Sequence, residues 1–393
     1  MLEKMSQDVK LLLSLLLPLL LIHCVQHIYL TYGTLLQSYG LSHEATGWIL
    51  GVFFMAAMVT RPLGGWLLES FGIRKALVFS GMLSFIGCSL FFFEQRADLL
   101  FIGRAISGAG FSIYTTGVFS HQAVCVSAKM RGAMFALLGL GGALPMSFMV
   151  PFGEWLLLSS RYTLYLAIGP ALSLLCCFLG WRVSVTAAKE ARGGGEKSWG
   201  TYRGLFSSRR YLVLLLTGTT IALIDAFIVN FSLLAAEKGL MASYFLASSS
   251  AAAVVLRLTG SHLLNVLPRV VLLAPCGILM SCAIIMASLF PTSGIFTITG
   301  ILFGAAIGAG WPMYHSLIGD TLDPALLPKG TSTALLLFDF GFFINPLIVG
   351  YFLPRFGATG SFMTIALAGG GALALLEIFY WLPLYLKKRI NRP

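Results

Sequence analysis

The chain has 393 residues, of which 58% are hydrophobic and only 10% are charged, and its mean hydropathy is +0.88. Soluble globular proteins contain about 25% charged residues, so this chain cannot cover its surface with polar groups, and a soluble protein is excluded. The net charge of +11 would suit a nucleic-acid-binding protein, but the placement of the basic residues indicates a membrane protein with no nucleic-acid partner.

Twelve apolar stretches are long enough to cross a membrane, which requires about 20 mostly apolar residues per helix. In chain order they cover residues 11–33, 43–68, 75–93, 99–124, 132–158, 162–185, 210–235, 242–266, 270–290, 294–318, 330–352 and 360–386. We interpret the first as a helix rather than a signal peptide, because Ile22 and His23, not small residues, precede Cys24. The sequence therefore predicts an all-α protein with 12 transmembrane helices.

Basic residues are unequally distributed among the connections between these stretches. If the N-terminus is inside, the inner loops and tails hold 19 of the 26 Lys and Arg residues, and the outer loops hold 4. Cytoplasmic loops carry an excess of these residues. We therefore expect both termini to be cytoplasmic and the protein to be a multi-pass component of the cell (inner) membrane.

No pattern of an enzyme, metal or cofactor site is evident. The seven cysteines fall in predicted helices without metal-ligand spacing. His23 and His27 are four residues apart and share a helix face, but a third metal ligand is not apparent. HExxH, GxSG and phosphate-binding Gly-Lys-Ser/Thr motifs are absent from the sequence. We predict a protein that is not an enzyme and needs no metal or cofactor.

The sequence contains an internal duplication. AISGAGFSIY at 105–114 and AAIGAGWPMY at 305–314 share five of ten residues at an offset of 200. Two further matches have nearly the same offset: 59–71 with 255–267, including Arg61 and Arg257, at 196, and 131–132 with 329–330 at 198. Three matches at about half the chain length favour a duplicated unit.

A polar, basic and Gly-rich segment at 186–209 separates the two copies and is predicted to be a cytoplasmic linker. We therefore predict an N-terminal six-helix bundle at 1–185 and a C-terminal six-helix bundle at 210–393, with parallel halves.

Small residues allow membrane helices to approach closely, so we expect Gly108, Gly110, Gly308 and Gly310 to serve helix packing. Arg104 precedes the first of these motifs, whereas residue 304 is glycine. From this difference we infer that the charge of Arg104 is not required for packing and has a functional role.

Six helices, a linker and six helices is a layout that resembles the major facilitator superfamily. Between helices 2 and 3, GGWLLESFGIRK is similar to the loop signature of that superfamily. In helix 4, Arg104, Gly108 and Gly110 match its Arg-x-x-x-Gly-x-Gly signature, whose arginine is associated with proton coupling. Residues 41–65, LSHEATGWILGVFFMAAMVTRPLGG, are similar to helix 2 of bacterial arabinose-efflux and drug–proton antiporter permeases.

The resemblance implies that helices 1, 4, 7 and 10 line a central cavity, and polar groups inside membrane helices mark functional sites by default. We predict that proton coupling involves Arg104, Asp225 and Asp339. Asp225 is also a candidate structural partner of Arg104, and Asp339 a candidate hydrogen-bond hub. The predicted substrate cavity contains His23, Gln26, His27, Tyr114, Asn230, Trp311 and His315. The predicted cytoplasmic gate contains Gly65, Glu69, Gly72, Arg74, Arg131 and Asn265.

We thus predict a secondary active transporter of a small organic solute that works by alternating access, with proton-coupled export as the main hypothesis. The alternative is proton-coupled symport, or uptake, of a small organic anion or chelate. The expected partners are the solute, protons and the lipid bilayer, and we expect a monomer. A channel is disfavoured because the duplication keeps the helix 4 charge in one copy alone.

Overall fold

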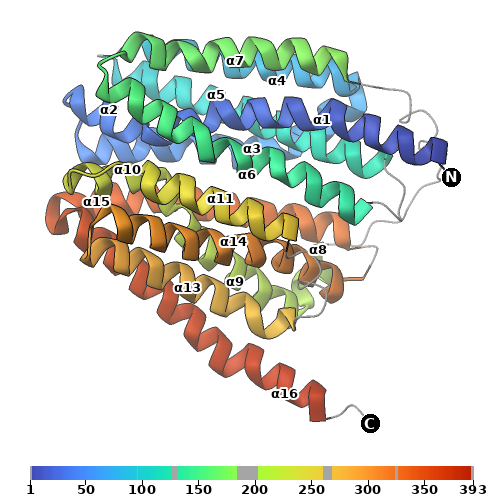
Figure 1. The fold of residues 1–393 in the computed structure, drawn as a ribbon. Coiled ribbons are helices and arrows are strands. Elements are labelled where there is room, and N and C mark those ends of the chain that lie inside the picture. Colours follow the sequence, from blue (N-terminus) through green and yellow to red (C-terminus); the bar gives the residue numbers. More distant parts are fainter. Residues whose placement is uncertain are drawn as a thin grey trace. The chain divides into compact units, whose positions relative to one another are not determined.

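The computed structural model describes residues 2–94, 96–125, 131–183, 202–259, 268–323 and 326–390, and this part of the chain is helical without β-strands (Figure 1). The chain divides into two compact units, Met1–Gly195 (unit 1) and Glu196–Pro393 (unit 2). Residues 186–201 of the predicted linker lie outside the described part. Its remainder contains the short helix α8 (Tyr202–Ser207) and the start of the next helix.

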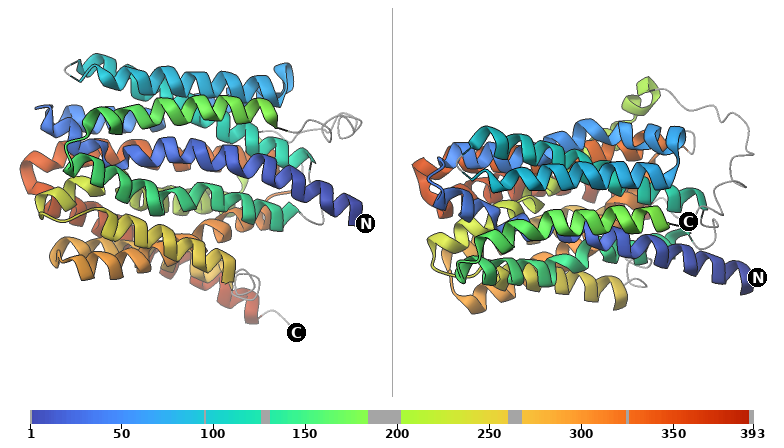
Figure 2. Two further views of the ribbon diagram at one scale, coloured as in Figure 1. Left: turned by 45° about the horizontal axis from the view of Figure 1, so that its top comes forward. Right: turned by 90° about the horizontal axis from the view of Figure 1, so that it is seen from above.

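Unit 1 is built from long helices that run alongside one another (Figures 1 and 2). They are α1 (Leu2–Ile28), continued by the 3-10 turn η1 (Tyr29–Thr31) and α2 (Tyr32–Ser38), then α3 (His43–Phe71), α4 (Ile73–Ser89) with the 3-10 turn η2 (Leu90–Phe92), α5 (Ala97–Cys125), α6 (Arg131–Leu158) and α7 (Tyr162–Arg182). Helix α5 packs against both α3 and α4, and α1 packs against α6 and α7.

Unit 2 repeats this construction. Its helices are α9 (Arg209–Asp225) and α10 (Phe227–Glu237), which form one interrupted span, α11 (Ser243–Thr259), α13 (Arg269–Leu289), α14 (Ser293–Thr321), α15 (Leu327–Leu376), the π-helical turn η4 (Glu377–Trp381) and α16 (Leu382–Ile390). Helix α14 packs against α11 and α13, and α15 packs against α9 and α13.

By length and composition, 8 helical segments of the described residues could span a membrane. The last, Gly330–Lys387, is 58 residues long, and the left-handed backbone at Gly357 (φ 65°) divides it into two passes. Helices α5, α6 and α11 are not among the eight. Helix α11 has 17 described residues, and parts of α5 and α6 have side chains outside the described part of the chain. All three pack inside their units, so the helix order confirms the prediction of 12 membrane helices.

Glycines bring the duplicated helices into backbone contact. A Cβ atom at Gly108 of α5 would overlap the carbonyl group of Phe53 on α3, and one at Gly304 of α14 would overlap the carbonyl group of Ser249 on α11. Phe53 and Ser249 correspond at the offset of 196 that also relates Arg61 to Arg257. By its contacts, Gly304 is therefore the counterpart of Gly108.

The sequence match had instead paired Gly304 with Arg104. At the offset of 196 the counterpart of Arg104 is Gly300, which lies against Phe245 and Ser248 of α11. The second unit therefore again has glycine at this position, and the functional role of Arg104 stays a prediction. Among the other packing glycines, Gly110 lies against Ser80 and Ser84 of α4, and Gly308 lies against Ala253 of α11. Gly310 makes an ordinary contact with Cys276 of α13.

Candidate functional site

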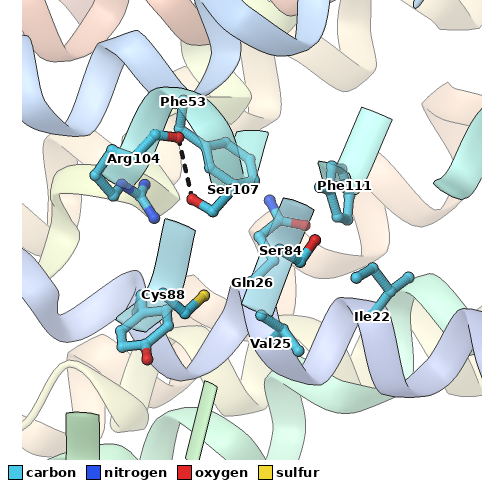
Figure 3. Close-up of a pocket in the computed structure, with 10 residues that line it drawn as sticks. Ile22, Val25, Gln26, Phe53, Ser84, Cys88, Arg104, Ser107 and Phe111 are labelled. Atoms are coloured by element: carbon cyan, nitrogen blue, oxygen red, sulfur yellow. Dashed lines mark hydrogen bonds between the residues drawn. The ribbon is translucent and has the colours of Figure 1, made fainter. Parts of the chain in front are cut away.

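Unit 1 contains a pocket between α1, α3, α4 and α5 (Figure 3). Its polar lining comes from Gln26 of α1, Ser84 and Cys88 of α4, and Arg104 and Ser107 of α5. The hydroxyl group of Ser107 donates a hydrogen bond to the carbonyl oxygen of Arg104 (3.0 Å). The pocket therefore gathers residues that lie far apart in the sequence around one permanent cation.

The guanidinium group of Arg104 is buried, and the side chain is only 4% exposed. Its Cζ atom lies 4.6 Å from the centroid of the Phe53 ring, a cation–π arrangement. Its Nε atom is buried without a hydrogen-bond partner, and no carboxylate of the described part forms an ion pair with it. A buried cation without an anion is costly, so this pocket is suited to receive a negatively charged group.

The two histidines of α1 lie next to this pocket. The Nδ1 atom of His23 lies 2.8 Å from the carbonyl oxygen of Leu19, so Nδ1 carries the proton. The His23 ring meets the pocket residue Phe111 edge to face, with centroids 5.1 Å apart, and lies 5.9 Å from the ring of His27. Arg61 of α3 lies within electrostatic range of His23, so a further basic side chain is near these histidines.

Tyr114, predicted to line the cavity, lies elsewhere. It is fully buried in the apolar core of unit 1 with Leu19, Ile22 and Leu77. Its hydroxyl group donates a hydrogen bond to the carbonyl oxygen of Cys176 on α7 (3.0 Å). In this structure Tyr114 therefore joins α5 to α7 and does not line the Arg104 pocket.

In unit 2, Trp311 and His315 of α14 form an aromatic stack with ring centroids 3.7 Å apart. The Nδ1 atom of His315 donates to the carbonyl oxygen of Trp311 (3.0 Å), while its Nε2 atom is buried without a partner in the described part. Trp311 also lines a small pocket with Gly218, Tyr314 and Phe338. This wall is aromatic, with a few buried polar atoms.

Asp225 lies at the interruption between α9 and α10 and is 8% exposed. It is within electrostatic range of Arg257 on α11, so the structure provides a basic neighbour for it inside unit 2. The pairing with Arg104 that the sequence suggested would join the two units and stays a prediction. Asp339 of α15 is also buried, at 6% exposed.

Asn230 is fully buried and braces the interrupted helix. Its Nδ2 atom donates to Oδ1 of Asn345 on α15, and Nδ2 of Asn345 donates to the carbonyl oxygen of Leu223, both at 2.8 Å. The predicted cavity residue Asn230 is therefore part of a helix-to-helix link.

Part of the predicted cytoplasmic gate is described. Gly72 joins α3 to α4 with φ 77°, a backbone conformation that favours glycine. The Nε atom of Arg74 donates to the carbonyl oxygen of Val183 (2.9 Å), at the end of α7. The surroundings of Gly65, the side chains of Glu69 and Arg131, and the whole of Asn265 lie outside the described part of the chain.

Phe53, Ser84 and Asn345 were not among the predicted site residues. Phe53 is one of many apolar residues in its helix, so nothing in the sequence predicts that its ring contacts Arg104. Ser84 lies on helix 3, which is not among the helices that the family resemblance places at the central cavity. Asn345 precedes a proline within a membrane helix, and that polar residue was the available signal.

Two units of helices that are long and apolar enough to cross a membrane define a multi-pass membrane protein. Residues 15–290 match the family model of the Major Facilitator Superfamily, which covers more than half of the chain, and the chain belongs to this superfamily. It is accordingly a secondary transporter of small molecules and not an enzyme.

Comparison with solved structures supports the same fold. The nucleoside transporter NupG is 14% identical with a TM-score of 0.74, and the match covers 95% of this chain and 99% of NupG. The human organic anion transporter MFSD10 (TETRAN) is 14% identical with a TM-score of 0.69, covering 95% of this chain and 99% of MFSD10. Comparison with curated protein sequences gave no match. At these identities the likeness concerns the fold alone.

Proposed function

We propose that the protein transports a small organic solute that carries a negative charge, and that transport is coupled to protons. The buried Arg104 supports this proposal, because its guanidinium group has no carboxylate partner in the described part of the chain. His23 and His27 lie beside this pocket and provide further polar groups for the solute. Neighbouring apolar groups, including Phe53 and Phe111, suit the organic part of such a solute.

Asp225 is the carboxyl group that we propose to exchange the coupling proton. It is buried at a break in a membrane helix, and Arg257 lies within electrostatic range. Gain of a proton would cancel the attraction between these two side chains, and loss of the proton would restore it. Such a change biases a transporter between two conformations if the pair is favoured in one of them. Asp339 is the second candidate.

We propose export as the direction, on the similarity of residues 41–65 to helix 2 of efflux permeases. Gly72 and Arg74, which the structure describes, belong to the loop that follows this helix. Uptake by symport is the alternative. If the solute is an anion, as the buried cation of Arg104 suggests, its uptake against the negative membrane potential needs the entry of positive charge, which co-transported protons would supply.

Proteoliposomes containing the purified protein and a pH-sensitive dye test the proposal. An imposed proton gradient is expected to drive accumulation of organic anions, with the direction of proton flow distinguishing antiport from symport. Matched uncharged amides and organic cations serve as controls. Transport that prefers cations, or that ignores both the proton gradient and the charge of the solute, would contradict the proposal.

A further inference from the structure

Ser84 differs from Ser80 and Ser89, the other two serines of α4. The hydroxyl group of Ser80 donates to the carbonyl oxygen of Ala76 (2.8 Å), and that of Ser89 donates to the carbonyl oxygen of Phe85 (2.7 Å). This bond to the preceding helical turn is the usual one for a serine inside a helix. The hydroxyl group of Ser84 is buried and has no partner in the described part of the chain.

The packing of α5 explains the difference. A Cβ atom at Gly110 would lie 2.5 Å from the Ser84 hydroxyl oxygen and 2.6 Å from the carbonyl oxygen of Ser80. That carbonyl is the group to which Ser84 would ordinarily donate. Close approach of the Gly110 backbone therefore covers the usual acceptor, and the hydroxyl hydrogen of Ser84 stays available for another one.

The free hydroxyl group faces the Arg104 pocket. Ser84, the amide group of Gln26 and the guanidinium group of Arg104 line it together, from three different helices (Figure 3). All three can donate hydrogen bonds, and no acidic side chain is among the residues that line the pocket. The rest of the wall is largely apolar, including Ile22 and Phe53. The pocket therefore offers several donors and one positive charge to a ligand that supplies acceptors.

We propose that this pocket binds a single carboxylate group, with Arg104 supplying the charge and Ser84 and Gln26 acting as further donors. The inference rests on the proposed function and makes it narrower: the transported solute is a carboxylic acid. A carboxylate carries one charge and accepts several hydrogen bonds, including a forked pair from arginine. A phosphate ester carries nearly two charges at neutral pH, and the described lining supplies one permanent cation.

Direct binding tests this inference without requiring transport. The purified protein in detergent is titrated with acetate, propionate and butyrate while its thermal unfolding is followed. Propionamide, chloride and methylphosphonate are the comparison ligands. We expect saturable stabilisation by the carboxylates and none by the amide. Ser84→Ala is expected to weaken the apparent Kd about tenfold, as for a hydrogen bond to a charged group.

Ser80→Ala is the matched control. It removes a buried hydroxyl group one turn away on the same helix, but that group bonds to its own backbone, so the Kd should not change. Gln26→Leu should weaken binding in the same direction as Ser84→Ala. If the alanine variant does not fold, Ser84→Cys, which keeps the volume and donates weakly, tests the same expectation.

Two results would overturn the inference: equal effects of Ser80→Ala and Ser84→Ala, or stabilisation by chloride or methylphosphonate that matches that by the carboxylates. Failure of the proposed function is separable, since it would appear as normal carboxylate binding without proton-coupled flux. If Ser84→Ala leaves transport of a charged solute unchanged, the proposed function still holds but the proposed carboxylate site is wrong.

Discussion

Phe53 contacts Arg104 through its ring and contacts the helix of Arg104 through its backbone carbonyl group. Its ring lies 4.6 Å from the Cζ atom of Arg104, and its carbonyl group lies against Gly108, one turn further along α5. The close approach of α3 and α5 at Gly108 thus brings the ring of Phe53 against the guanidinium group of Arg104. The position of the guanidinium group is a consequence of helix packing.

Replacement of Phe53 by leucine should weaken anion transport without preventing folding. Leucine keeps the backbone contact with Gly108 but loses the cation–π interaction, which is worth about 1 kcal/mol or roughly fivefold in affinity. Transport assays in proteoliposomes should show a higher KM, whereas Phe54→Leu, beside it on α3, should have a smaller effect. An unchanged KM for Phe53→Leu would show that the ring does not position Arg104.

Arg104→Gln should abolish concentrative transport while leaving the protein as stable as before or more stable. Loss of a buried charge that binds an anion costs about 2 kcal/mol or more, roughly thirtyfold in affinity, but removal of an uncompensated buried cation relieves its desolvation. Thermal unfolding without ligand and flux measurements report the two effects separately. Arg96→Gln, which loses an exposed pair with Asp98, is the control. A large loss of stability in Arg104→Gln would indicate a structural role instead.

Asp225→Asn should uncouple transport from the proton gradient and retain exchange of solute across the membrane. An amide has nearly the shape of a carboxyl group but cannot bind and release a proton. Counterflow should persist, while accumulation driven by a pH gradient should disappear. Asp98→Asn, at the start of α5, provides a control. If Asp225→Asn still accumulates solute with the same pH dependence, Asp339→Asn becomes the variant to test.

Gly304→Ala should destabilise unit 2, because the added methyl group meets the carbonyl group of Ser249. Overpacking of this kind costs about 1–3 kcal/mol. Gly319→Ala lies on the same helix, where an added Cβ has no neighbour within 4 Å, so it should be neutral or stabilising, since alanine favours helix. Unfolding midpoints in one detergent compare the two. Equal midpoints would mean that α11 and α14 can separate at little cost.

Asn230→Ala should destabilise the protein by about 1–3 kcal/mol, because it leaves the buried Oδ1 atom of Asn345 without its donor. The double variant with Asn345→Ala should cost less than the sum of the single variants, since the two side chains act together. A double-mutant cycle on unfolding free energies measures this coupling. If the losses of unfolding free energy are additive and Asn230→Ala alone loses solute binding, Asn230 acts in the substrate cavity as the sequence predicts.

Features that depend on local composition and chain length could be predicted from the sequence. Long apolar stretches have to form helices in lipid, because every backbone polar group must be satisfied within its own segment. The helix count, the duplication and the superfamily followed from this patterning. It also singled out Arg104, since a permanent charge in a membrane helix is rare whatever its neighbours are.

Which residues face one another could not be predicted from the sequence, because it depends on how the helices pack. Tyr114 and Tyr314 match in the repeat, yet the hydroxyl group of Tyr114 bonds to α7, whereas that of Tyr314 has no partner in the described part. The pairing of Gly304 with Gly108 likewise depends on how far one helix slides along its neighbour. A slide of one turn returns the same face to the interface, because helical residues four apart lie above one another. Sequence periodicity is therefore unchanged by such a slide, while the contacts of every residue along the interface are replaced.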